Sequence, residues 1–128
     1  MLFRSQSELP PERVVEMWVP TLFVKSVSAE VIEKTAVIMS EFHPVGMRTM
    51  LLSFAEADLR DMLPTIKVPT LLLHGEADQR SPLNVVENLH AKIPTSRLVI
   101  IPAVGHEISL EAPEAFNAEV RSFLLANP

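Results

Sequence analysis

The sequence predicts an α/β protein, with a helical N-terminal half followed by a strand, a helix, a strand and a helix. Two short apolar runs, residues 70–74 and residues 97–101, carry the strand prediction. Short apolar runs bounded by turn residues are typical of strands buried on both faces of a sheet. The third observation is the helical spacing of apolar residues from 44 to 55. Because a helix separates the two strands, we expect them to be parallel, with a right-handed crossover.

Before residue 58 the chain shows only helical patterns. Pro10 and Pro11 precede a short helix that begins near Glu12, since proline suits the first turn of a helix. Pro20 is expected to interrupt this helix, because proline has no backbone N–H to donate to the preceding turn.

Two further helices follow in the N-terminal half. Ser28 is a suitable N-cap for a helix over residues 29–41, whose apolar side chains fall on one face. Pro44 opens the next helix, and its apolar stripe fits the helical template fully. The stripe consists of Met47, Met50, Leu51, Phe54 and Ala55. Met39, Met47, Met50 and Phe54 are expected to pack inside the protein, with a substrate pocket as the alternative.

The predicted strands lie in the C-terminal half, which begins near residue 58. Ser81 and Pro82 predict a helix start, with serine as N-cap and proline at the first helical position, and this helix stops before Pro94. Pro113 begins the last helix. The predicted organisation is therefore a helical segment over residues 1–57 and a core segment over residues 58–128.

Composition excludes several classes of protein. The net charge of −5 argues against nucleic acid and anionic membranes as partners, since both attract basic surfaces. The sequence has no cysteine, which excludes disulfides and a cysteine nucleophile and fits the cytoplasm. No apolar run approaches the roughly 20 residues of a membrane span. We therefore expect a cytoplasmic globular protein.

The predicted sheet has too few strands to be stable by itself. Parallel sheets need cover on both faces and several neighbouring strands. We expect the strand that contains residues 71–73 to be an open edge, and an open edge favours pairing with another chain. This expectation predicts a homodimer or a larger assembly.

Two residues follow the predicted strands in a way that suggests catalysis. Asp78 follows the first strand after Gly75, and His106 follows the second strand directly after Gly105. The two glycines are expected to allow tight turns. Loops at the C-terminal ends of parallel strands face one crevice, where ligands bind in open α/β sheets. An aspartate and a histidine that meet there have the chemistry of two members of a catalytic triad.

Residues 58–125 closely resemble the C-terminal part of α/β-hydrolase-fold enzymes. The resemblance rests on Gly-x-x-Asp after the penultimate strand and Gly-His after the last one, and it is strongest for the lactonase, esterase and cofactor-free haloperoxidase group. It implies hydrolysis of a small carboxylic ester or lactone, with no metal or organic cofactor. It also implies that His106 is the general base, that Asp78 fixes its tautomer, and that residues 1–57 correspond to a helical cap.

The nucleophile of such an enzyme is missing from this sequence. A serine elbow of the form G-x-S-x-G needs two glycines four positions apart, and the glycines here are Gly46, Gly75 and Gly105. We expect the chain alone to be inactive, because the serine and the oxyanion donors would have to come from another chain or from further sequence. The alternative function is a non-catalytic, oligomerising domain derived from a hydrolase.

The remaining polar residues of interest are expected to have structural roles. Glu76 is expected to be an exposed loop carboxylate, and His74 a hydrogen-bonded histidine of the core. The chain from His106 to Leu110 begins like the zinc motif H-E-x-x-H, but Leu110 stands where the second histidine is required. No metal site is therefore expected. Glu111 is expected to stabilise the start of the following helix through the helix dipole.

Overall fold

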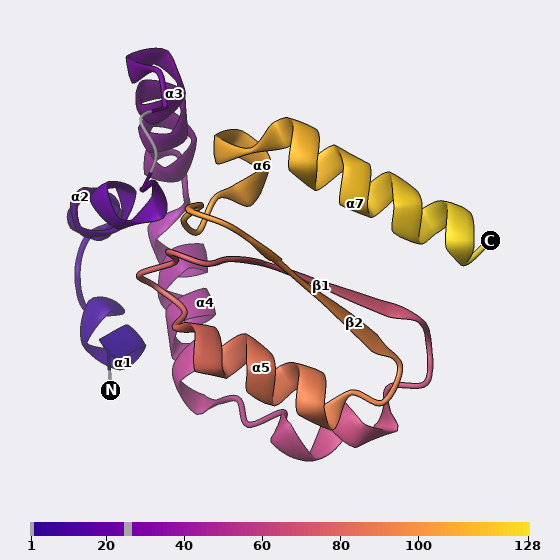
Figure 1. Ribbon diagram of the computed structural model, residues 1–128. Helices are drawn as coiled ribbons and strands as arrows, with labels where there is room; N and C mark the ends of the chain where they lie inside the picture. Colours follow the sequence, from indigo (N-terminus) through magenta and orange to yellow (C-terminus); the bar gives the residue numbers. More distant parts are fainter. Residues whose placement is uncertain (1, 25–26) are drawn as a thin grey trace. The chain divides into compact units, whose positions relative to one another are not determined.

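The computed structural model describes residues 2–24 and 27–128, and the chain divides into two compact units (Figure 1). The units are Met1–Pro20 with Ser28–Asp58, and Thr21–Val27 with Leu59–Pro128. The carbonyl oxygen of Leu22, in the second unit, accepts backbone hydrogen bonds from the loop that contains His106.

The first unit is helical. Its helices are α1 (Leu2–Gln6), α2 (Pro11–Leu22, whose last two residues belong to the second unit), α3 (Ala29–Ser40) and α4 (Pro44–Glu56). Ser28 caps α3 by accepting a hydrogen bond from the Val31 N–H at 3.3 Å, as predicted. The predicted start of α4 at Pro44 is also confirmed, whereas the short helix α1 was not predicted.

The expected interruption at Pro20 is wrong, because α2 continues through this residue to Leu22. Proline removes one backbone donor and places its ring against the preceding turn, and a helix can tolerate this by bending. Pro20 lies in the last turn of α2, where only two further residues follow, and it is exposed to solvent.

The core of the first unit forms where α2 packs against α4. Val14, Met47 and Leu51 are buried together, so the expected packing role is confirmed for Met47. The Phe3 ring makes edge contacts with Trp18 and with Phe54, at centroid distances of 6.4 Å and 5.6 Å. These aromatic contacts add α1 to the same core.

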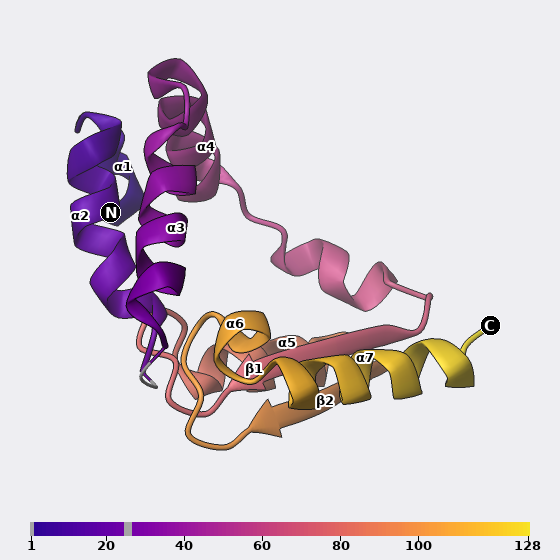
Figure 2. The same cartoon turned by 90° about the horizontal axis from the view of Figure 1, so that it is seen from above.

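The second unit contains a two-stranded parallel sheet, as predicted. Its elements are the 3₁₀ helix η1 (Arg60–Thr65), β1 (Thr70–Gly75), α5 (Leu83–Lys92), β2 (Ser96–Ile101), α6 (Ile108–Glu111) and α7 (Pro113–Ala126). The register pairs Thr70 with Ser96 and Gly75 with Ile101, so both strands end at the same level. Figures 1 and 2 show α7 running beside the strands.

The two faces of this sheet are covered by different helices. One face packs Leu73 and Val99 against α6 and α7 in a cluster with Ile101, Val104 and Ile108. Helix α5 contacts both strands, and Figure 1 shows it on the side opposite α7. The leucines of β1 were expected to be fully buried, but they are only half-buried, because two strands form a narrow sheet.

The start of α5 corrects a second expectation. The helix begins at Leu83, and Pro82 occupies the N-cap position in an extended conformation, so Ser81 is not the cap. The backbone N–H of Ser81 instead donates to the side chain of Asp78 at 3.1 Å. Ser81, which was predicted to cap a helix, therefore contributes a backbone donor to the candidate site.

Candidate active site

The candidate site lies where the loops after β1 and β2 meet. Nδ1 of His106 lies 2.8 Å from Oδ2 of Asp78, a hydrogen bond between residues 28 positions apart. The parallel register explains this meeting, because Gly75 and Ile101 end the strands side by side. The structure thus brings together the two residues that the sequence singled out.

Asp78 is held as a buried hydrogen-bond acceptor. Its side chain is only 5% exposed, and its second oxygen, Oδ1, accepts from the backbone N–H groups of Arg80 at 2.7 Å and Ser81 at 3.1 Å. Burial by itself raises the pKa of Asp78, but the hydrogen bonds from His106, Ser81 and Arg80 outweigh burial and hold this pKa below its usual value of 3.8. Asp78 is therefore ionised at neutral pH.

The ionised carboxylate fixes the chemistry of His106. A carboxylate only accepts, so the proton of this hydrogen bond sits on Nδ1 in the tautomer that the pair favours. The other ring nitrogen, Nε2, then carries the lone pair and can take a proton from a hydroxyl group. The His106 side chain is 39% exposed, so a reacting group can approach the ring.

Gly75 allows the two loops to approach each other. A β-carbon on Gly75 would lie 2.1 Å from the carbonyl oxygen of Gly105 and 2.4 Å from that of Val104, which no real side chain permits. A tight turn follows Gly75 as expected, since the Asp78 N–H donates to the Gly75 carbonyl at 3.1 Å, but none of the described glycines has a positive φ. The requirement at Gly75 is close packing of backbone on backbone.

Backbone hydrogen bonds hold the loops in this arrangement. The Glu76 N–H donates to the carbonyl of Ile101 at 3.0 Å, and the Ala77 N–H donates to that of Val104 at 2.9 Å. The exposed carboxylate of Glu76 accepts from the Ala103 N–H at 3.0 Å. Ala103 has a φ of 53°, so this side-chain contact supports a strained turn before His106. Glu76 is exposed as expected, with a bracing role that the sequence did not predict.

Glu111 has contacts that its predicted role at a helix start did not include. Its carboxylate accepts from the backbone N–H groups of Gly105 and Val24, each at 3.0 Å, in addition to any effect on the dipole of α7. No pattern among neighbouring residues predicts such a contact, because one donor, the Val24 N–H, is 87 positions away in the chain. The only hint in the sequence is that Glu111 follows His106 by five residues within a short helix.

The other histidines lie apart from this pair. His74 is buried in β1 as expected, but its Nε2 atom has no hydrogen-bond partner among the described residues, so the expected hydrogen bond is not found there. His90 is exposed on α5, and its Nδ1 atom lies 2.8 Å from the hydroxyl of Ser96. Within residues 2–24 and 27–128, no group of histidine, aspartate and glutamate side chains could hold a metal ion.

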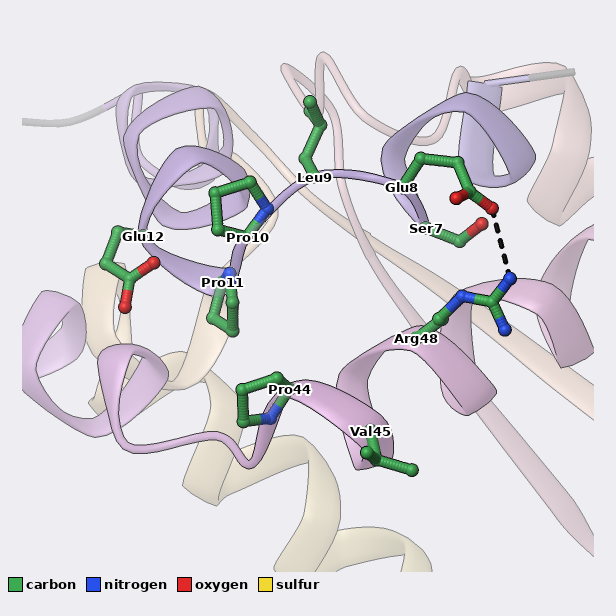
Figure 3. Close-up of a pocket in the computed structure, with 9 residues that line it drawn as sticks. All are labelled: Ser7, Glu8, Leu9, Pro10, Pro11, Glu12, Pro44, Val45 and Arg48. Atoms are coloured by element: carbon green, nitrogen blue, oxygen red, sulfur yellow. Dashed lines mark hydrogen bonds and ion pairs between the residues drawn. The ribbon is translucent and has the colours of Figure 1, made fainter.

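A separate surface pocket lies in the first unit (Figure 3). It has a volume of about 560 Å³ and is lined by residues 7–12 and by Pro44, Val45 and Arg48. Arg48 donates to Glu8 across it at 3.2 Å, as the dashed line in Figure 3 shows. The lining contains no histidine and no catalytic pair, so this pocket is not the candidate active site.

None of the described helices is long and apolar enough to cross a membrane.

Comparison with known proteins identifies the family. The family model described as alpha/beta hydrolase fold matches residues 44–113, more than half of the chain. A pimeloyl-(acyl-carrier protein) methyl ester esterase from Vibrio vulnificus is 33% identical over 81 residues, which cover 63% of this chain and 32% of that protein. A non-heme haloperoxidase from Rhodococcus erythropolis is 34% identical over 73 residues, which cover 56% and 27%.

The structural comparison agrees with the sequence comparison. A thermophilic esterase from Thermogutta terrifontis is 32% identical with a TM-score of 0.85, and the match covers 97% of this chain and 47% of that structure. The chain therefore belongs to the alpha/beta hydrolase fold family. It spans less than half the length of each of these three proteins.

Proposed function

We propose that this chain supplies the acid and the base of a serine hydrolase that acts on small carboxylic esters, including lactones, which are cyclic esters. The observation that carries the proposal is the 2.8 Å hydrogen bond between His106 Nδ1 and the buried carboxylate of Asp78. The similarity to esterases of 32–33% identity supports ester substrates.

His106 acts as general base in this proposal. Its Nε2 atom takes the proton of a serine hydroxyl as the oxygen attacks the ester carbonyl, and the proton later passes to the leaving alcohol. Asp78 holds the ring in the required tautomer and stabilises the imidazolium that forms. Acyl transfer of this kind needs no metal and no organic cofactor.

The nucleophile and the oxyanion donors come from outside these 128 residues, since no G-x-S-x-G is present. We therefore propose that the isolated chain is inactive and that its acid–base pair works when the preceding part of a hydrolase fold is supplied. Its location in the cytoplasm stays a prediction.

A chimera tests the catalytic role. The part of the Thermogutta terrifontis esterase that aligns with this chain is replaced by residues 1–128, and hydrolysis of a short-chain p-nitrophenyl ester is measured. We expect turnover by the chimera and none by the isolated chain. His106→Ala should abolish turnover, and Asp78→Asn should lower kcat by about 10⁴ because the imidazole tautomer is no longer fixed.

His90→Ala serves as the matched control, because His90 is an exposed histidine of the same unit outside the pair. It should leave turnover unchanged. Full activity in a folded His106→Ala chimera would show that His106 is not the base. Turnover by the isolated chain that His106→Ala abolishes would instead show a nucleophile within these residues.

A non-catalytic, oligomerising domain is the second candidate function. It is supported by the sheet, which consists of β1 and β2 alone among the described residues and so leaves β1 an open edge. In this candidate the β1 edges of two copies pair. Light scattering across the micromolar range tests this candidate. A dimer mass for the parent chain and a monomer mass for Leu72→Pro would support edge pairing. A monomer mass at every concentration would contradict it.

A further inference from the structure

The loop that carries His106 has three successive backbone donors whose partners all lie outside the loop. The Gly105 N–H donates to Oε1 of Glu111 at 3.0 Å. The N–H groups of His106 and Glu107 donate to the carbonyl oxygen of Leu22 at 3.1 Å and 3.2 Å. The position of His106 therefore depends on two acceptors, the Glu111 carboxylate and the Leu22 carbonyl.

Glu111 also bonds to the segment that contains Leu22. Its second oxygen, Oε2, accepts from the Val24 N–H at 3.0 Å, and Val24 is two residues beyond Leu22. One carboxylate thus links the residue before His106 to the segment whose carbonyl holds His106 itself. The packing is tight, since a β-carbon on Gly105 would lie 2.7 Å from Oε1 of Glu111 and 3.0 Å from a methyl group of Val24.

The same segment is tied to the loop of Asp78. The Arg80 guanidinium donates to the Thr21 hydroxyl at 3.1 Å, while the Arg80 backbone N–H donates to Asp78. Residues 21–24 therefore contact both loops of the acid–base pair. The Glu111 side chain bonds both residues 21–24 and the His106 loop.

We propose that Glu111 is a positioning residue, which holds the His106 imidazole against Asp78 by bonding residues 21–24 to the His106 loop; this inference rests on the proposed catalytic role of the pair. A carboxylate is required because two N–H donors approach two different oxygens, and bonds to an ionised acceptor are stronger than neutral ones. Glutamine offers one acceptor oxygen, so it can keep only one of these bonds.

The test uses NMR on the 128-residue chain and needs no turnover, so it stays informative even if the catalytic proposal fails. The variants are Glu111→Gln and Glu111→Ala. The control is Glu114→Gln, an exposed glutamate in the first turn of α7. The readouts are the exchange rate with water of the proton on Nδ1 of His106 and the amide protection of Val24 and Gly105.

We expect the proton on Nδ1 to exchange roughly tenfold faster in Glu111→Gln, the size expected for loss of one hydrogen bond, and faster still in Glu111→Ala. Glu114→Gln should match the parent chain. If the Nδ1 proton exchanges at the parent rate in the Glu111 variants while Val24 and Gly105 lose protection, Glu111 stabilises the fold without positioning His106, and the proposal is wrong. If Glu111→Ala does not fold, Glu111→Gln, which retains one bond, decides the question in the same way.

Discussion

The backbone of Gly75 lies directly against the carbonyl group of Gly105, so the residue that ends β1 contacts the residue that precedes His106. This contact leaves no room for a methyl group. The hydrogen bond between Asp78 and His106 depends on it, because Asp78 lies three residues after Gly75 and His106 follows Gly105 directly.

Gly75→Ala should lower the free energy of unfolding by about 3 kcal/mol, since the atoms that the new methyl group would meet are backbone atoms that cannot move aside. The control is Gly46→Ala in α4, because a β-carbon there would meet only His43, at 4.0 Å. This variant should stabilise the helix by about 0.5–1 kcal/mol. Urea unfolding measures both changes. Equal midpoints for the two variants would contradict the close approach of the loops.

Asp78→Asn should change how stability depends on pH. The pKa of Asp78 is lowered in the folded chain, so its ionised form stabilises the fold above the unfolded-state value of about 3.8, and this contribution is lost as the pH falls through the lower folded-state pKa. Unfolding free energies from pH 7 to pH 2.5 should therefore converge for the parent chain and the variant at acid pH. Parallel profiles would show that Asp78 is not stabilised as a carboxylate.

His74→Leu should raise the free energy of unfolding by about 1–3 kcal/mol. The imidazole is buried, and its Nε2 atom has no partner among the described residues, so leucine removes the cost of burying an unsatisfied polar atom. His90→Leu, at an exposed position, is the comparison and should change stability by less than about 0.5 kcal/mol. Marked destabilisation by His74→Leu would mean that Nε2 has a partner, such as a buried water.

Pro20→Ala should stabilise the chain by up to about 3 kcal/mol, because alanine restores a donor inside α2 and removes the ring from the preceding turn. The gain is reduced by the greater freedom of the unfolded chain. Pro44→Ala, at the start of α4 where proline fits, should give no such gain. Thermal unfolding compares the two, and equal shifts would show that Pro20 costs the helix nothing.

The sequence predicted the elements whose signals are local. The N-cap at Ser28, the helix starts at Pro44 and Pro113 and the two parallel strands follow from capping, proline placement and apolar runs. The Asp78–His106 hydrogen bond could be anticipated because parallel strands end together at one edge of a sheet.

The features that the sequence did not reveal depend on contacts between distant residues. Glu111 bonds to Val24 across 87 positions, and Gly75 is required by the backbone of Gly105 and not by its own conformation. The helix through Pro20 shows the opposite case, in which a strong local signal against a helix is overridden by its context. Local preferences alone contain none of this information.

The two residues of the pair differ in how much the folded backbone depends on their side chains. The Asp78 carboxylate accepts from the N–H groups of Arg80 and Ser81, so selection for folding alone would retain it or an asparagine in its place. The ring of His106 is more exposed, with 39% of its side chain accessible against 5% for Asp78, and it bonds to that side chain. Folding alone therefore requires the carboxylate of Asp78 more than it requires the imidazole of His106.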